Sequence, residues 1–486
     1  MKIIKLGNEA REGLKKGIDA VADILKTTLG PHGKNSTIGR VALGPLTTND
    51  GVTIAKHIEL EDEVENLGVQ VIRQVTLETD RDAGDGTTTS AVIAQKLAGT
   101  CFDRLGSDSL LNSTESQIGL MRDISTALDQ TLLEIDKKTK KVKSKKTLQD
   151  IAFTSVEDKK VGDLIADIVW QTGEHGSVLF QESKSRDITG EVIDGYTLDV
   201  GYASLYFGKG GFAEVINPLI FTTNGVIDSR EKLAAPIHEA VGKEEKRSLI
   251  VIAKDFSDQM INEMVATKLK GHMDIYAIQV PNEDKIRDIS AVVGSKFIDA
   301  NLDPALKVTR EDLGSCERAV IDIQKSLFLK GKGDTSDRVK ELESQKGDNE
   351  AINEQLNTRI AELNGKSGVI KVGANSETEK DYWLLKVEDA ISATQSALKE
   401  GVVKGGGLTL KEIGEKNNTI LSDALQAPYN QIQENAGGGL EIPDTVLDPV
   451  NVTKTALSRA CSVVGTLITT DSVIVDKNEN NKNEDN

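Results

Sequence analysis

The sequence predicts a multidomain α+β protein, and three observations lead to that fold class. The chain has 486 residues, which is too long for a single hydrophobic core, so two or three domains are expected. Up to about Ile135 and again after Glu388, apolar residues recur at helical spacing. The middle of the chain instead contains short apolar runs that are typical of strands. Two mostly helical parts therefore flank a part with more β-structure.

The first helical part begins after a short predicted strand, Lys2–Lys5. Five apolar residues at spacings of three or four mark the face of its first helix that should pack against a core. These residues are Leu14, Ile18, Val21, Leu25 and Leu29. A segment rich in glycine and threonine, Gly84–Ser90, interrupts the helical pattern, so we expect a loop there between two helices.

A lysine-rich run, Lys137–Lys146, follows the first helical part, and we place a domain boundary near Asp136. The run has two interpretations, a patch for nucleic acid or a solvated helix face. The net charge of −18 favours the solvated face, because phosphates are attracted by clustered Lys and Arg. We therefore expect no binding to nucleic acid.

The middle of the chain contains both strands and helices. Ser177–Phe180 and Ser248–Ala253 are short apolar runs that predict strands. Between Asp334 and Gly365, apolar residues at helical spacing are interrupted at Gly347–Asn349. This pattern predicts a helical hairpin, which we expect to pack against its own domain.

Composition excludes several other classes of protein. No stretch approaches the ~20 apolar residues that span a bilayer, so we expect no membrane partner. The three cysteines lie far apart, and the five histidines lack the spacing of metal ligands. The start of the chain has neither a signal sequence nor a transit sequence. These observations together predict a cytoplasmic protein.

The loop Gly84–Ser90 precedes an apolar helix and has the composition of an anion site. Backbone N–H groups at a helix start attract phosphate, and the carboxylate of Asp85 is a hard oxygen ligand that suits Mg²⁺. The alternative is that Thr87–Ser90 only cap the helix, and on this loop alone the two interpretations are about equally good.

Further glycine loops and carboxylates occur elsewhere in the chain. Gly30–Lys34 has the wrong spacing for a Walker A loop, which disfavours a P-loop kinase. Taken separately, Asp50 is most simply interpreted as a turn residue, and Asp389 as a carboxylate on a helix surface. Phosphoryl transfer to water, however, needs a phosphate cradle, a metal and a carboxylate that orients the water. The glycine loops with Asp50, Asp85 and Asp389 would supply all three.

Six segments in order resemble the motifs of GroEL-type (group I) chaperonins. They are Thr28–Gly33, Asp50–Ala55, Gly84–Thr89, Val387–Ala390, Glu400–Gly407 and Leu447–Thr453. The resemblance extends from about Lys5 to Val475. It implies an ATP-dependent chaperonin that captures unfolded proteins on an apolar apical surface and folds them in a ring-shaped chamber, with Mg²⁺-dependent ATP hydrolysis timing the cycle.

The resemblance also implies a GroEL-like domain layout. A mostly helical equatorial ATPase domain and a small intermediate hinge domain would each be split in two, and an α/β apical domain would bind clients. The predicted segments are equatorial 1–135, intermediate 136–190, apical 191–372, intermediate 373–400, equatorial 401–475, and a disordered polar tail 476–486.

By the same resemblance, Asp389 would position the attacking water, Asp50 would support it, and Asp85 would hold Mg²⁺. Asp448 would contact the ribose. The other residues that would bind the nucleotide are Thr28, Leu29, Gly30, Pro31, Gly86, Thr87, Thr88, Thr89 and Gly406. ATP and Mg²⁺ are the implied cofactors, and the resemblance also allows K⁺ as a second cation.

Two segments of the middle part resemble the client-binding surface of the family. Tyr202, Tyr206 and Phe207 would face the ring opening from one segment. The predicted helix 259–270 would contribute Ile261, Val265 and Ala266. Without the resemblance, all six residues would be interpreted as ordinary core. The match slips by one residue around Pro236, so the first client helix is not assigned.

Partners follow from the resemblance, as do the departures from it. The implied partners are unfolded polypeptides, copies of the chain in a homo-oligomeric ring of seven, and a GroES-like co-chaperonin. Only 40 residues, 408–447, separate Gly407 from Asp448, which is fewer than the family usually has. The Gly-Met repeats at the C-terminus are replaced by a polar tail. These departures suggest a shortened, divergent member that is either phage-encoded or an accessory copy, and a phage-encoded member would act in the host cytoplasm.

Two functions of other classes remain open. The chain could be a ring or scaffold protein that holds clients without productive ATP hydrolysis, although the three aspartates argue against that. It could also be a small-molecule kinase that uses the glycine-rich loops, but the sequence indicates no acceptor pocket.

Overall fold

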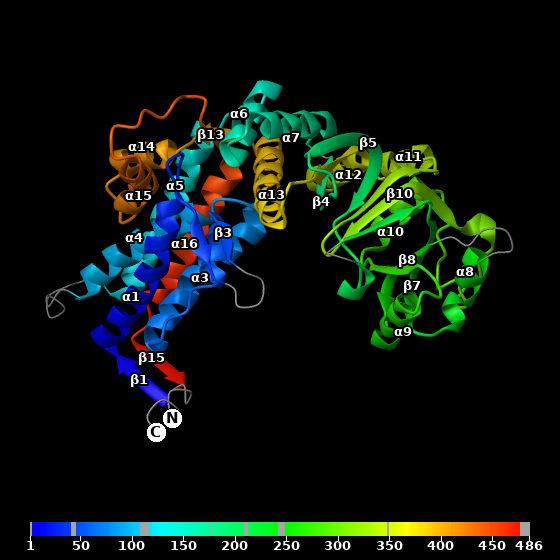
Figure 1. Ribbon diagram of the computed structural model, residues 1–486, viewed down its shortest axis with the longest axis horizontal. Coiled ribbons are helices and arrows are strands. Elements are labelled where there is room, and N and C mark those ends of the chain that lie inside the picture. Colours follow the sequence, from blue (N-terminus) through cyan, green and yellow to red (C-terminus); the bar gives the residue numbers. More distant parts are fainter. Residues whose placement is uncertain are drawn as a thin grey trace. The chain divides into compact units, whose positions relative to one another are not determined.

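The computed structural model describes residues 2–39, 45–106, 116–174, 176–208, 212–241, 248–347 and 349–476. The chain divides into two compact units, and each combines helices with strands (Figure 1). Unit 1 consists of residues 1–167, 182–188 and 372–486, and unit 2 consists of residues 168–181 and 189–371. The predicted multidomain α+β class is therefore confirmed. The finer division into equatorial, intermediate and apical segments stays a prediction.

Unit 1 is mostly helical and is built from both ends of the chain. Its helices are α1 (Gly7–Leu25), α2 (Gly51–Lys56), α3 (Glu63–Ala83), α4 (Thr87–Gly106), α5 (Gln117–Lys138), α6 (Lys145–Val156), α13 (Glu377–Glu400), α14 (Leu408–Lys416), α15 (Ser422–Asn435) and α16 (Val450–Leu467). α7 (Lys159–Thr172) continues into unit 2. None of the helices in the described ranges is long and apolar enough to cross a bilayer.

The core of unit 1 lies where α1, α3, α4 and α16 pack together (Figure 1). Ile18 of α1, Ile72 of α3 and Leu457 of α16 are among the residues buried there. Two glycines let α1 and α3 approach closely. A Cβ on Gly17 would lie 1.8 Å from the carbonyl oxygen of Glu65, and one on Gly68 would lie 2.1 Å from that of Leu14. The contact therefore excludes any larger residue at these two positions.

The two ends of the chain close unit 1 by pairing as strands. β1 (Lys2–Leu6) runs antiparallel to β15 (Ser472–Asp476). The Lys2 ammonium contacts the Asp476 carboxylate at 2.6 Å. The predicted N-terminal strand is confirmed, whereas placing Asp476 in a disordered tail is wrong, because Asp476 ends a paired strand. The rest of the predicted tail, 477–486, lies outside the described residues.

Two further two-stranded antiparallel sheets belong to unit 1 and lie next to its glycine loops. β2 (Ser36–Ile38) pairs with β3 (Leu46–Thr48), and β13 (Val402–Lys404) pairs with β14 (Leu447–Pro449). β13 follows directly from α13, so the chain leaves α13, forms this strand and enters α14 through a glycine turn. That turn is part of the candidate site.

The lysine-rich run was predicted to be a solvated helix face. Most of it is instead the connection between α5 and α6. Lys137 pairs with Glu134 and Lys146 pairs with Asp150, in each case at 2.7 Å. Lys138 contacts Glu412 at 2.6 Å. Because these lysines are neutralised by carboxylates of the same unit, the run has the solvated, structural role that the net charge indicated.

Unit 2 contains a mixed sheet in the order β4-β12-β5-β11-β10-β7-β8-β9, and β6 also pairs with β10. The strands are β4 (Ser177–Glu182), β5 (Thr189–Leu198), β6 (Phe212–Ile216), β7 (Leu219–Ile227), β8 (Leu249–Phe256), β9 (Ile275–Gln279), β10 (Gly314–Asp322), β11 (Ser326–Gly331) and β12 (Lys366–Val372). Both strands predicted in this part are confirmed. β8 is buried over Leu249–Ala253, which fits its place between two parallel neighbours.

Helices join and cover the strands of unit 2. α8 (Glu231–Val241) and α9 (Asp258–Leu269) connect the parallel strands β7, β8 and β9, and α10 (Glu283–Val293) follows β9. α11 (Ser336–Ser344) and α12 (Glu350–Leu363) form the predicted helical hairpin, which packs against its own unit as expected (Figure 1).

A buried ion cluster attaches the hairpin to α10. The Asp288 carboxylate is fully buried and accepts hydrogen bonds from Arg338 Nε at 2.8 Å and Arg359 Nε at 2.9 Å. Asp284 contacts both guanidinium groups at 3.2 Å. Without Asp288, two largely buried cations would lose their main partner, and that is far more costly than losing a surface ion pair.

We expect Asp288→Ala to loosen the hairpin by about 3–5 kcal/mol, because it removes the fully buried carboxylate that both guanidinium groups share. Hydrogen exchange of the α11 and α12 backbone amides measures this opening locally, as a chain of two units requires. The control is Asp337→Ala, which removes an exposed carboxylate at 3.0 Å from Lys340 and should cost under about 1 kcal/mol. Equal exchange in the two variants would contradict a role for Asp288 in attaching the hairpin.

Candidate functional site

The candidate site begins where the N-termini of two helices of unit 1 meet. Gly84 and Gly86 have φ of +66° and +83°, so the chain turns sharply between α3 and α4. α2 starts at Gly51, directly against the start of α4. A Cβ on Gly51 would lie 2.7 Å from Thr87 Oγ1. The N-terminus of α4 therefore presents N–H groups and a positive dipole end beside the start of α2, which favours an anion there.

The loop Thr28–Pro31 lies beside this junction. Thr28 Oγ1 donates to the carbonyl oxygen of Leu25 at 2.8 Å and lies 3.4 Å from Thr88 Oγ1. Gly30 has φ of +82°, and a Cβ there would lie 3.0 Å from Ile432 Cγ1 of α15. The structure thus brings the threonine hydroxyls of α4 close to this loop. The sequence predicted both segments but gave no contact between them.

A third glycine turn, between β13 and α14, brings Asp448 to the same region. Gly406 and Gly407 have φ of +61° and +74°. Asp448 lies in β14 opposite Val403 and accepts a hydrogen bond from the Gly406 backbone N–H. A Cβ on Gly405 would lie 2.6 Å from Asp448 Oδ1, so a side chain there would displace the carboxylate.

Asp50, Asp85 and Asp389 are each held by a different local device. Asp50 is the N-cap of α2 and accepts from the N–H groups of Val52 at 3.2 Å and Thr53 at 2.8 Å. Asp85 accepts from the backbone N–H of Gly86 at 2.5 Å. Asp389 lies on α13, one turn before Ser392. Ser392 packs so closely against Gly84 that a Cβ on that glycine would lie 2.7 Å from the serine Oγ. All three carboxylates remain partly exposed.

Asp85, Asp389 and Asp448 each have a raised pKa because of burial and nearby carboxylates. Burial raises the pKa of Asp389 well above its ordinary value, and the charges of Asp85 and Asp50 raise it further. Burial also raises the pKa of Asp85, although the Gly86 N–H opposes the shift. The pKa of Asp448 rises to about 7, because of burial and the nearby charge of Asp85. A cluster of acids with raised pKa values favours a bound cation.

Sequence analysis missed two charged groups of this cluster. Lys386 is buried on α13, and its Nζ lies 3.2 Å from both the carbonyl oxygen of Ser155 and Glu157 Oε1. Its charge lowers the pKa of both Asp85 and Asp389. Asp80 on α3 has a raised pKa, through burial and the charge of Asp50. Lys386 could have been found from the sequence by its spacing, because it precedes Asp389 by three residues and so lies on the same helix face.

The residues present fit Mg²⁺ together with a phosphate chain, and they do not form a metal cage of their own. Within the described parts of the chain, no group of three or more His, Cys, Asp or Glu side chains could hold a metal ion. Mg²⁺ typically takes one or two carboxylates and completes its shell with waters and phosphate oxygens. Asp85 at the helix junction fits that pattern.

Three predicted client-binding residues are buried, so the expectation that they face outward is wrong. Tyr202, Phe207 and Val265 are exposed by 6%, 1% and 8%. Tyr202 forms a backbone bridge with Ile278, and the Phe207 ring lies 6.3 Å from that of Tyr276. These side chains fill the core beneath η3 (Leu205–Phe207) and α9, which is the alternative that the sequence left open.

The remaining predicted client residues lie nearer the surface. Tyr206 is 70% exposed, and its neighbour Leu205 is 64% exposed. Ile261 and Ala266 are half-buried on α9. Ala266 is the only one of the six that lines a pocket of about 410 Å³ between α8 and α9. The other apolar residues of that pocket are Leu233, Ile237, Met260, Met264 and Ile275.

Sequence analysis did not find the α8 wall of this pocket, because its motif match slipped at Pro236. That proline lies inside α8, whose Leu233 and Ile237 face the pocket at a spacing of four residues. The apolar periodicity of 231–241 was therefore the usable signal.

The chain is similar to known proteins in sequence and in fold. The sequence model of the TCP-1/cpn60 chaperonin family matches residues 21–438. Among solved structures, the chaperonin gp146 from bacteriophage EL 2 (Pseudomonas aeruginosa), crystallised in the presence of ATP-BeFx, is similar in two crystal forms. Form II has a TM-score of 0.70 at 20% identity, covering 98% of this chain and 100% of that one. Form I has a TM-score of 0.67 at 19% identity, covering 98% and 99%. At such identities the likeness shows the fold.

The raised pKa of Asp448 predicts a specific pH dependence. Its pKa of about 7 in the folded chain exceeds the ordinary value of 3.8, so the stabilisation present at low pH is lost as the pH rises through 7. Asp448→Asn avoids that loss. In urea denaturation at pH 5 to 8, the stability of the variant relative to wild type should therefore increase with pH, by on the order of 1 kcal/mol. A difference that does not change with pH would contradict the assignment.

Proposed function

This chain belongs to the TCP-1/cpn60 chaperonin family, and from that membership we propose that it is an ATP-dependent chaperonin that captures and folds unfolded polypeptides. The observation that carries the proposal is the junction of α2 and α4. Two helix N-termini, three glycine turns and the carboxylates of Asp50, Asp85 and Asp389 meet there within one unit. A phosphate chain needs those donors, and its cation needs those acids.

Each residue has a role that its position supports. The N–H groups of Thr87 to Thr89 and the loop Thr28–Pro31 would hold the phosphates, and Asp448 would contact the ribose. Asp85 would hold Mg²⁺, which neutralises charge on the phosphate oxygens when it is bound. Asp389 would orient the attacking water and accept its proton, and a raised pKa makes it a better proton acceptor than an ordinary carboxylate. Asp50 fixes the start of α2.

Client capture is the second half of the proposal and uses unit 2. The pocket between α8 and α9 is lined by six apolar residues beside five polar ones, and Tyr206 with Leu205 exposes further apolar surface in the same unit. Apolar surface of this kind commonly marks a site for another protein. An extended apolar segment of an unfolded client fits such a site, because it needs burial rather than a particular sequence.

Assembly and origin are part of the same proposal. We propose a homo-oligomeric ring of seven copies, with a GroES-like lid as a further partner, in the cytoplasm of a host cell if a phage encodes the chain. A non-cycling ring that only holds clients is the alternative. Release of phosphate from ATP by the purified chain separates these two functions, because only the cycling ring turns over.

We expect Asp389→Ala to bind ATP with Mg²⁺ but to hydrolyse it about 10²- to 10⁴-fold more slowly, because the phosphate donors remain while the proton acceptor is lost. Phosphate release and calorimetric binding measure the two effects separately. Asp381→Ala, two turns earlier on the same helix, is the matched control and should turn over normally. Normal turnover in Asp389→Ala would remove that residue from the site.

We expect Tyr206→Glu to reduce capture of a chemically unfolded client at least about tenfold while ATP hydrolysis stays near normal, since a charge in an apolar contact is costly. The assay is suppression of client aggregation on dilution from denaturant. The control is Ile352→Glu, which places the same charge on an apolar residue of α12 that is 49% exposed. If both variants capture clients equally well, the surface around Tyr206 is not the client site.

A further inference from the structure

One side chain outside the predicted site attaches the nucleotide loop to α15. Asn435, the last residue of α15, donates from Nδ2 to the carbonyl oxygens of Lys26 at 2.8 Å and Leu29 at 2.9 Å. These carbonyls belong to the two ends of the segment Lys26–Leu29, which leads into Gly30. A backbone carbonyl only accepts hydrogen bonds, so only the amide nitrogen of Asn435 can make both contacts.

We propose that Asn435, oriented by Gln431, is a positioning residue that sets the conformation of the nucleotide loop and thereby the affinity for ATP. This inference rests on the proposed function, because it assumes that the loop binds a nucleotide. Asn435 itself need not touch the nucleotide, since it acts through the peptide group that it holds.

The peptide between Leu29 and Gly30 carries the effect. In a planar trans peptide, the C=O and N–H groups point in opposite directions. Because Asn435 holds the Leu29 carbonyl toward α15, the Gly30 N–H must point away from α15. In the described ranges, no protein acceptor is paired with that N–H. The hydrogen bond of Asn435 therefore keeps a free donor of the loop aimed in one fixed direction, where a phosphate or ribose oxygen can accept from it.

The backbone of Gly30 does not by itself fix the direction of the peptide that precedes it. Its φ of +82° belongs to the left-handed region, and Ile432 of α15 fills the space where a Cβ would lie. A glycine peptide has a low cost for rotation, so its direction is decided by the hydrogen bonds that it makes. α15 thus contacts the loop twice, through Ile432 against Gly30 and through Asn435 against the preceding carbonyls.

Gln431 determines which way the amide of Asn435 faces. Its Nε2 donates to Asn435 Oδ1 at 2.9 Å, one turn away on the same helix. If the Asn435 amide rotated by half a turn, its oxygen would face two carbonyl oxygens and its nitrogen would face the Gln431 donor. Every contact would then be repulsive. The pair therefore has one favourable arrangement, and that arrangement is the one that holds the loop.

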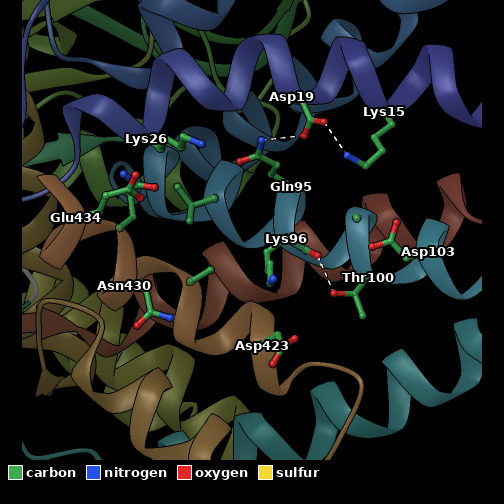
Figure 2. A pocket seen from close by; sticks show the side chains of 14 residues that line it. Lys15, Asp19, Lys26, Gln95, Lys96, Thr100, Asp103, Asp423, Asn430 and Glu434 are labelled. Atoms are coloured by element: carbon green, nitrogen blue, oxygen red, sulfur yellow. Dashed lines mark hydrogen bonds and ion pairs between the residues drawn. The ribbon is translucent and has the colours of Figure 1, made fainter.

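Gln431 borders a pocket, and neither Gln431 nor Asn435 belongs to the hydrophobic core. Gln431 lines a polar pocket of about 420 Å³ between α1, α4 and α15. In Figure 2, Lys26 and Glu434 lie at one end of this pocket, and Lys15 and Asp103 lie at the other end. Both Gln431 and Asn435 are partly exposed. Substitutions at these two positions therefore remove hydrogen bonds without opening a cavity in the core, so the variants should fold.

The test uses the full-length chain in the Asp389→Ala background, where ATP with Mg²⁺ binds without turnover. Asn435→Asp replaces the donor with a carboxylate opposite two carbonyls, and we expect the Kd for ATP to rise about 10- to 100-fold. Gln431→Met removes only the orienting donor, and we expect a rise of about 3- to 10-fold. Isothermal titration calorimetry measures each Kd.

The matched control makes the same chemical change in unit 2. Asn353 on α12 donates from Nδ2 to the carbonyl oxygen of Gly347 at 2.6 Å, and its Oδ1 accepts from the Gly347 N–H at 3.0 Å. Asn353→Asp therefore also loses an amide-to-carbonyl hydrogen bond, but far along the chain from the nucleotide loop. Its Kd for ATP should equal that of the parent.

Kinetics on the otherwise wild-type chain distinguish positioning from general damage. Asn435→Asp should raise KM for ATP by a factor similar to that for Kd and leave kcat within about twofold, because the groups that act on the water are untouched. A Kd within twofold of the parent, or a loss confined to kcat, overturns the proposal for Asn435. If the parent itself binds no ATP, the proposed function fails first, and this inference fails with it.

Discussion

Crowding of negative charge at the junction of α2 and α4 is the constraint on which unit 1 depends. Asp50, Asp85, Asp389 and Asp448 come from four separate parts of the chain, and the charge of Asp85 raises the pKa of both Asp389 and Asp448. Lys386 is the cation whose charge opposes this effect. Such a cluster costs free energy unless a cation joins it or protons are taken up. A bound cation would therefore stabilise the site, and Mg²⁺ bound with a nucleotide would supply that positive charge.

Glycine makes this crowding geometrically possible. Gly84, Gly86, Gly406 and Gly407 turn the chain at positive φ exactly where carboxylates must approach helix starts. Gly51 and Gly405 have no side chain to hold Thr87 and Asp448 at a distance. The helices that carry these turns need no such freedom, and their buried faces are ordinary aliphatic packing. Rigid helices thus position turns whose conformation only glycine adopts at low cost.

In unit 2, the residues that stabilise the fold differ from those that form its exposed apolar surface. Its parallel strands and the ion cluster around Asp288 hold the unit together, while the pocket between α8 and α9 and the exposed Tyr206 lie on helices at its surface. The aromatic residues next to Tyr206 are used differently, because Tyr202 and Phe207 anchor the η3 turn into the core. One anchored turn can therefore present a single exposed ring without exposing the rest of the segment.

The fold class, the strands and hairpin of unit 2, and the glycine loops with their acids could all be predicted from the amino-acid sequence. Those features are local, since periodicity, turn residues and motif order are properties of neighbouring residues in the chain. Which side chains face solvent could not be predicted in this way, as Tyr202 and Val265 illustrate, because burial depends on what packs against an element. The tertiary structure decided both this exposure and the partners of distant residues. Asn435 and Leu29 are far apart in sequence, and no local pattern predicts the hydrogen bond that joins them, because it exists only once α15 has packed against the loop.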